Sequence, residues 1–227
     1  MYSTRNRTAK VIVGAALLWA AAADAATAAA TSAPANALVV APPSALCATT
    51  AQASAVAATY AKTPAPPTFA AAAMLKIPEA VVASALPPTI AIGVAGDQFR
   101  AVWESMSEWD SAVALIMKGG DVFEISTKIA KGTPSKTSKF YNLGEAALSG
   151  HLRPDLISAL YAVQIAGKEG AMRGVMFYDG NGDNVFGVFA RGAAEGKDPS
   201  TQQLAQFEAT WNLIKSLPRA CPGPAAG

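Results

Sequence analysis

The chain has 227 residues, 52% of them hydrophobic, and carries 18 lysines and arginines against 16 aspartates and glutamates. This length is enough for one domain with a sizeable hydrophobic core. The near balance of charge, with no cluster of basic residues on any one predicted element, argues against a nucleic-acid-binding protein.

The N-terminus has the features of a cleavable secretory signal. Three basic residues precede the apolar stretch 11–23, and Ala23-Asp24-Ala25 fits a cleavage site. The stretch is shorter than the roughly 20 apolar residues of a membrane-spanning helix. We therefore expect residues 1–25 to be removed and the mature protein, without a membrane span, to be periplasmic or secreted.

One folded domain is predicted to follow the signal. Residues 26–55 are rich in Ala, Pro and Thr and are predicted to be a flexible segment, in whose last part an alanine-rich helix over 45–62 begins. The folded domain is predicted over 56–217 and a short tail over 218–227. Within the domain, apolar positions predict two short helices over 68–86, the second opening at a proline, Pro78.

An amphipathic helix over 97–109 is predicted next, with Phe99, Val102, Trp103 and Met106 on its buried face. The period then changes to that of strands. The predicted strands are a hairpin of 113–117 with 122–125 around Gly119-Gly120, single strands at 139–143 and 156–165, and a hairpin of 174–178 with 184–190.

The last predicted element is a helix over 199–217, capped by Asp198, with Leu204, Phe207, Trp211 and Ile214 on its buried face. Helices thus precede a run of hairpin-connected strands, and one helix closes the chain. This order predicts an α+β fold, in which small N-terminal helices and a C-terminal helix pack on an antiparallel β-sheet.

The chain has two cysteines, Cys47 and Cys221, one before the predicted strands and one near the C-terminus. In an oxidising compartment they are expected to form a disulfide that ties both ends to the domain. Two free thiols are the alternative.

The sequence excludes several metal sites. No C-x-x-C-H motif for covalent haem attachment is present. The segment Asp179-Gly180-Asn181-Gly182-Asp183 resembles the start of an EF-hand loop, but Asn184 and Ala190 stand where that loop requires glycine and glutamate. A single histidine cannot build a multi-histidine site.

That histidine, His151, is the strongest candidate for chemistry. It lies in the segment SGHLRPD, and a neutral imidazole is the commonest proximal ligand of haem iron. Arg153 is a candidate partner for a haem propionate. On spacing alone, a surface histidine beside an ordinary arginine is the competing interpretation.

Six segments, in order, resemble the ChuX/HutX haem-utilisation carriers: GDQFRAVWESMSEW from Gly96, then DVFE, KFYNLG, SGHLR, MFYDGNGDNVFGVF and QLAQFEATW. The resemblance covers roughly residues 70–215. It implies an antiparallel sheet of the HemS/ChuX type with flanking helices, often paired as a homodimer. It also implies that the protein holds haem non-covalently and passes it between donor and acceptor proteins.

The resemblance also implies site residues. His151 falls on the histidine of the family's GGH or SGH motif, a candidate haem ligand. Met117 takes the place of the family's second histidine, which is read either as a loss of binding or as a change to His/Met ligation. Tyr141 is a further candidate as a phenolate ligand, or packs in the sheet.

Two departures from the family leave other functions open. The family's loop is replaced by IAGKEGAMR over 165–173, and these carriers normally act in the cytoplasm, whereas this chain is predicted to be exported. A haem-degrading redox enzyme and a ligand-free periplasmic interaction module that kept the fold are the alternatives. The absence of conspicuous polar machinery for oxygen activation favours a haem or tetrapyrrole carrier over an enzyme.

Overall fold

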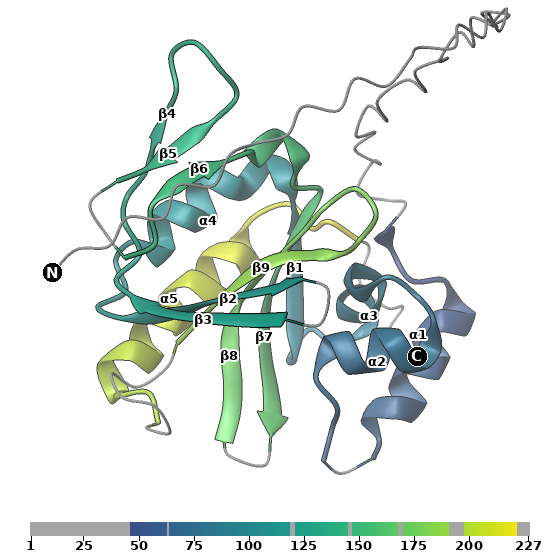
Figure 1. Cartoon of the computed structure of the whole chain (residues 1–227). Helices are drawn as coiled ribbons and strands as arrows, with labels where there is room; N and C mark the ends of the chain where they lie inside the picture. The colour runs from purple at the N-terminus through teal and green to yellow at the C-terminus, as the bar shows by residue number, and fades with distance from the viewer. Residues whose placement is uncertain are drawn as a thin grey trace, which may run out of the picture. The chain divides into compact units, whose positions relative to one another are not determined.

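The computed structural model describes residues 46–62, 64–118, 121–144, 147–167, 170–190 and 198–221. The predicted signal peptide, residues 1–25, lies outside the described residues, as does the turn Gly119-Gly120. Within the described ranges the chain alternates short helices with two antiparallel sheets (Figure 1).

The larger sheet has six strands in the order β1-β7-β8-β9-β2-β3, and every neighbouring pair is antiparallel. Its strands are β1 (Ala91–Ala95), β2 (Ala112–Lys118), β3 (Asp121–Thr127), β7 (Ala159–Gly167), β8 (Gly170–Tyr178) and β9 (Asn184–Phe189). The smaller sheet has the order β4-β5-β6 and consists of β4 (Thr133–Pro134), β5 (Tyr141–Leu143) and β6 (Gly150–Leu152).

The helices are α1 (Thr50–Tyr60), α2 (Thr68–Leu75), α3 (Glu79–Ala85), α4 (Phe99–Met106) and α5 (Thr201–Ser216), with single 3-10 turns at Gly96–Gln98 and Pro154–Leu156. In Figure 1, α1, α2 and α3 form one group beside β1, whereas α4 lies next to the small sheet. Helices α4 and α5 contribute to the same buried cluster. This arrangement confirms the predicted α+β fold.

The two faces of the larger sheet carry separate hydrophobic cores, because successive strand residues point to opposite faces. Leu160 and Ala162 of β7 pack with α4, α5 and the small sheet, in one buried cluster. Tyr161 and Val163, which alternate with them, pack with the helices α1–α3 in the other. A change of one residue in register would therefore exchange the two cores.

The centre of the first core is aromatic. Trp103 of α4 is fully buried and lies edge-on to Phe177 of β8 and Phe186 of β9, at centroid distances of 6.1 Å each. The indole N–H of Trp103 donates to the Ala130 carbonyl at 3.0 Å. The predicted buried face of this helix is confirmed, since all four predicted residues are buried.

Some predicted boundaries were wrong. The last helix begins at Thr201, not at residue 199, because Ser200 rather than Asp198 caps it: the Ser200 hydroxyl accepts from the Gln203 N–H at 3.2 Å, and the Gln203 side chain accepts from the Ser200 N–H at 2.7 Å. This reciprocal pair is a capping box. The strand predicted from residue 156 begins at Ala159, because Pro154–Leu156 forms a 3-10 turn.

Three short strands were missed, and one predicted helix is shorter than expected. Strands β1, β4 and β6 were not predicted. The predicted alanine-rich helix over 45–62 is present as α1, which begins at Thr50, where Thr49 and Gln52 form a second capping box. Capping of this kind stabilises a helix start by about 1 kcal/mol.

A disulfide joins Cys47 to Cys221, with the two Cα atoms 5.6 Å apart. The segment before Cys221 adds to the edge of the larger sheet, where Arg219 bridges Val94 and the Ala220 N–H donates to the Gly93 carbonyl at 3.0 Å. Of the two predicted states of the cysteines, the structure has the bridge. It ties the start of the helical group to the chain end that lies along β1.

Candidate functional site

His151 lies on β6, the last strand of the small sheet, a strand that was not predicted from the sequence. Gly150, which precedes it, has φ of +144°, a conformation that side chains with a Cβ rarely adopt, and an added Cβ there would meet nothing within 4 Å. The glycine of the S-G-H segment therefore serves the backbone conformation at the start of β6.

The histidine faces outward from the small sheet. In the register of β5 and β6, Asn142 pairs with His151, and Tyr141 pairs with Leu152. Tyr141 and Leu143 belong to the buried core, so Asn142 and His151 lie on the opposite, outer face. His151 is exposed and Asn142 is half-buried.

A hydrogen bond defines the chemistry of this imidazole. His151 Nδ1 and Asn142 Oδ1 are 2.8 Å apart. An amide oxygen can only accept, so Nδ1 carries the proton and Nε2 keeps its lone pair when the ring is neutral. A neutral imidazole with an available Nε2 is a ligand for a transition metal.

A row of contacting side chains, here called the stack, runs from the imidazole through Phe140 and Arg153 to Asp155. The Phe140 ring lies 5.6 Å from the His151 ring, centroid to centroid, and the Arg153 guanidinium lies 5.6 Å from the Phe140 centroid. Arg153 in turn donates from Nε and from an Nη to the two carboxylate oxygens of Asp155, at 2.7 and 2.8 Å. This chain of contacts links an ion pair to the position of the histidine.

The charges at the base of the stack are neutralised. Lys139 Nζ lies 3.3 Å from Asp155 Oδ2. The hydrogen bond from Arg153, together with that from Lys139, lowers the pKa of Asp155 to about 2. The predicted propionate partner Arg153 thus already holds a carboxylate of the protein, and two of its five N–H groups are engaged there.

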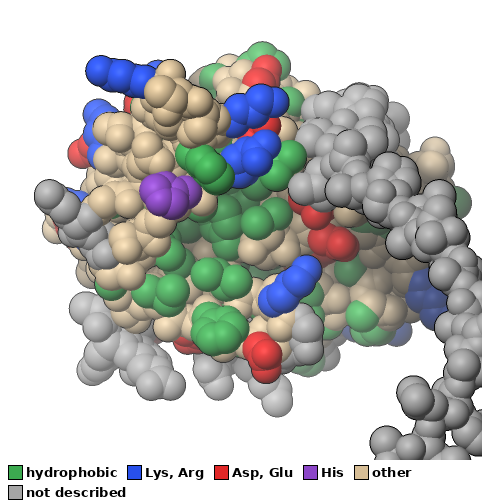
Figure 2. Space-filling model, turned by 45° about the horizontal axis from the view of Figure 1, so that its top comes forward, with side chains coloured by type: hydrophobic (Ala, Val, Ile, Leu, Met, Phe, Trp, Pro, Cys, Tyr) green, Lys and Arg blue, Asp and Glu red, His purple; other side chains and the backbone are tan. Residues whose placement is uncertain are grey.

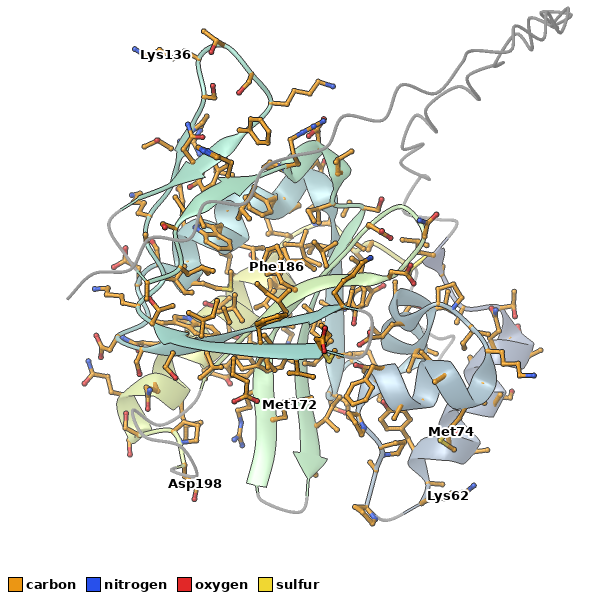
Figure 3. The ribbon with its side chains drawn as sticks, in the orientation of Figure 1. Lys62, Met74, Lys136, Met172, Phe186 and Asp198 are labelled. Atoms are coloured by element: carbon orange, nitrogen blue, oxygen red, sulfur yellow. A yellow bond between two sulfur atoms is a disulfide. The ribbon has the colours of Figure 1, made fainter. Side chains whose placement is uncertain are left out.

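A hydrophobic hollow adjoins the histidine. Figure 2 shows the single histidine, in purple, at the margin of a hollow whose floor is hydrophobic and whose border carries basic side chains. The half-buried Ile116 of β2 and Leu152 of β6 rest on the core cluster that contains Phe186, labelled in Figure 3. Phe123 of β3 pairs with Ile116, so it shares that face, and it is 57% exposed.

Met117 lies on the other face of the larger sheet. Ile116 packs on the core with α4 and α5, whereas Leu115 packs on the core with α1–α3. By alternation Met117 shares the face of Leu115, and it pairs with Val122 of β3. The described structure therefore does not bring Met117 to the side of the sheet on which His151 lies.

Tyr141 packs in the core. Its ring lies edge-on to Phe99 and Trp103, at centroid distances of 5.6 and 6.4 Å, and the residue is 3% exposed. Its hydroxyl has no hydrogen-bond partner among the described residues. Burial, with a smaller contribution from Glu104, raises the pKa of this phenol, which opposes the phenolate that a metal would need.

Two pockets occur on the described surface, and the first adjoins residues that support His151, among them Phe140 and Asp155. One of about 550 Å³ lies between the start of α4 and the segment before β5, and Asp97, Arg100, Lys139 and Phe140 contribute to its lining. The other, of about 820 Å³, is apolar and lies between α1 and the segment after α3, beside the disulfide. His151 lines neither pocket.

Residues 92–210 match the family model described as haem utilisation ChuX/HutX, and the chain belongs to this family. It is 30% identical over 150 residues to the intracellular heme transport protein HutX of Vibrio cholerae, a match that covers 63% of this chain and 75% of HutX. The resemblance found in the sequence is thereby confirmed.

Solved structures show the same fold. The crystal structure of ChuX superposes with a TM-score of 0.64 at 18% identity and covers 72% of this chain and 99% of ChuX. Holo-PhuS, a heme-binding protein from Pseudomonas aeruginosa, superposes with a TM-score of 0.57 at 21% identity and covers 77% of this chain and 47% of PhuS.

No single described helix is long and apolar enough to cross a membrane; α2 and α3 have that length and apolar composition only together, and they are bent by 107° at their junction. Sequence reasoning missed the residues that support the histidine, namely Asn142, Phe140 and Asp155. One signal was present: in K-F-Y-N-L, an alternation of two marks Phe140 and Asn142 as partners on one face, opposite Tyr141.

Proposed function

We propose that this protein is a carrier that binds haem non-covalently, with Nε2 of His151 as an iron ligand, and passes it on within the cell envelope. The observation that carries the proposal is the oriented histidine. This chain belongs to the ChuX/HutX family, and its single histidine lies at the margin of a hydrophobic hollow, with Nδ1 hydrogen-bonded to Asn142.

The residues present fit the chemistry of haem. Haem supplies an iron that accepts a neutral imidazole, two apolar faces and two carboxylates. Nε2 of His151 suits the iron, and the hydrophobic floor of the adjoining hollow suits the porphyrin faces (Figure 2). Apolar area covered by a ligand contributes about 25 cal/mol per Å².

The haem carboxylates require donors at the border of the hollow. Arg153 keeps three N–H groups beyond the two given to Asp155. We propose that these donate to a propionate while Asp155 holds the guanidinium in place. Met117 and Tyr141 are not included among the ligands, because one lies on the far face of the sheet and the other is buried in the core.

The proposed location rests on the sequence of residues 1–25. A periplasmic carrier would meet haem between the two membranes, whereas the relative HutX is described as intracellular. N-terminal sequencing of the protein purified from a periplasmic extract should give a chain that starts near Ala26. Recovery of the uncleaved chain in the cytoplasm would overturn the envelope location without affecting haem binding.

The test of haem binding is a haemin titration of the protein without residues 1–25, followed by absorbance in the oxidised and reduced states. The wild type should show a saturable Soret shift with a stoichiometric end point, and His151→Ala should shift or abolish that band. An unchanged spectrum in His151→Ala would refute ligation by this residue.

Met117→Leu is the matched control, since it keeps an apolar side chain of similar size. The geometry predicts the wild-type spectrum in this variant. If the wild type shows sharp low-spin reduced bands and Met117→Leu loses them, Met117 is a second ligand, as one interpretation of the sequence had it. In that case β2 and β6 rearrange when haem binds.

A further inference from the structure

Asn142 is both the strand partner and a hydrogen-bond partner of His151. The two residues pair directly across β5 and β6, and directly paired residues of antiparallel strands project to the same face. Their side chains meet at 2.8 Å, between Oδ1 of the amide and Nδ1 of the ring. Neither the family resemblance nor the sequence motifs gave this asparagine a role.

We infer that Asn142 is a positioning residue for His151: it holds the neutral imidazole as the Nδ1–H tautomer and thereby keeps the Nε2 lone pair available to a ligand. A neutral imidazole places its single proton on either nitrogen, and the hydrogen bond made by one nitrogen decides which form dominates. The functional part of this inference rests on the proposed haem binding.

The position of Asn142 is fixed by the core beneath it. Tyr141, its neighbour, is 3% exposed and lies edge-on to both Phe99 and Trp103. Because strand residues alternate, an inward Tyr141 forces Phe140 and Asn142 to the outer face together. Tyr141 was a candidate ligand in the sequence. Its buried ring instead places Phe140 and Asn142 on the face of the sheet where His151 lies.

The imidazole is held at two places. Asn142 bonds to Nδ1, and the Phe140 ring lies against the imidazole at a centroid distance of 5.6 Å and an interplanar angle of 51°. Phe140 itself is covered by Arg153, which the Asp155 carboxylate anchors through two hydrogen bonds. The hydrogen bond restrains one ring atom and the ring contact restrains rotation about the Cβ–Cγ bond.

A restrained ring binds metal better for two reasons. A hydrogen bond accepted from Nδ1–H raises the basicity of Nε2, and the fixed tautomer removes the need to move a proton before ligation. Removal of such a partner typically lowers metal affinity about 10- to 100-fold. We expect the same range for haem if the acceptor of Asn142 is removed.

The test compares three variants of the protein without residues 1–25. Asn142→Leu removes the acceptor at similar size, Asn142→Asp keeps an oxygen acceptor, and His151→Ala removes the ligand. The first measurement needs no haem. Because the chain has one histidine, a two-bond ¹H–¹⁵N correlation spectrum of the apoprotein, purified without a histidine tag, contains a single imidazole.

At a pH well above the ordinary imidazole pKa of about 6.5, the wild type and Asn142→Asp should show the pattern of an Nδ1–H ring. Asn142→Leu should lose that pattern and bind haemin about 10- to 100-fold more weakly. Asn142→Asp should bind haem with a more negative reduction potential, because the added charge makes the imidazole a stronger donor.

An Nε2–H ring in the wild type, or an Nδ1–H ring that survives in Asn142→Leu, would overturn the inference. Equal haemin affinity of Asn142→Leu and the wild type, alongside weakened binding by His151→Ala, would overturn its functional part. If His151→Ala leaves the Soret band unchanged, ligation by this histidine fails, and the apoprotein spectra still decide whether Asn142 sets the tautomer.

Discussion

The turn between β8 and β9 provides a quantitative test of how the helical group docks on the sheet. Gly182 in this turn has φ of +80°, and its carbonyl accepts the N–H of Ala80 in α3 at 3.0 Å. A Cβ added to Gly182 would lie 2.7 Å from the Cβ of Pro78 and 3.1 Å from Leu46 Cδ2. The perturbation is the substitution Gly182→Ala.

Two costs add in this variant. A left-handed conformation costs a residue with a Cβ about 1–2 kcal/mol. The Pro78 Cβ belongs to a ring at the start of α3 and cannot rotate away, so the contact is overpacking, which costs about 1–3 kcal/mol. We expect a loss of about 2–5 kcal/mol out of a stability that for most domains is about 5–15 kcal/mol.

The assay is urea unfolding followed by tryptophan fluorescence. With an m-value of about 2 kcal/mol/M, the midpoint of Gly182→Ala should fall by about 1–2.5 M. Gly144→Ala is the control, since an added Cβ there meets nothing within 4 Å. It should leave the midpoint unchanged or raise it slightly. A Gly182→Ala midpoint equal to that of the control would refute the docking argument.

Two further predictions concern the same region. Burial raises the pKa of the Glu79 carboxyl, to which Thr68 donates at 2.5 Å and near which Asp183 lies, so its folded pKa stands above its unfolded value. Its contribution to stability is then complete below the unfolded pKa and is lost as the pH rises through the folded pKa. Glu79→Gln should match the wild type in urea unfolding near pH 4 and exceed it at pH 8, and parallel curves across this range would contradict the assignment. Replacement of both cysteines by serine opens a loop with a sequence separation of 174 and should lower the free energy of unfolding by about 5 kcal/mol. Equal urea midpoints for this double variant and the oxidised wild type would show that the bridge adds no stability.

Local patterns were enough to predict most of the elements. The β2–β3 and β8–β9 hairpins are marked by apolar runs that flank glycine-rich turns, and α4 is marked by its buried stripe. The apolar periodicity and turn residues that mark these elements lie within short stretches of the sequence, so their signals are local. Strand β6, with three residues, and β1, with five, carry too little periodicity to be recognised, and each is defined by a partner distant in the chain.

The sequence by itself determined the α+β class, the single histidine and its family motif, and the pair of cysteines able to form a bridge. Only the tertiary structure decided what surrounds His151. Whether Tyr141 or Asn142 reaches the histidine depends on which face of β5 meets the aromatic core, and alternation then fixes the other residue. The same alternation separates Met117 from His151, because neighbouring residues of β2 project to opposite faces of the larger sheet. Such face assignments follow from packing between distant segments, and no local pattern in the sequence contains them.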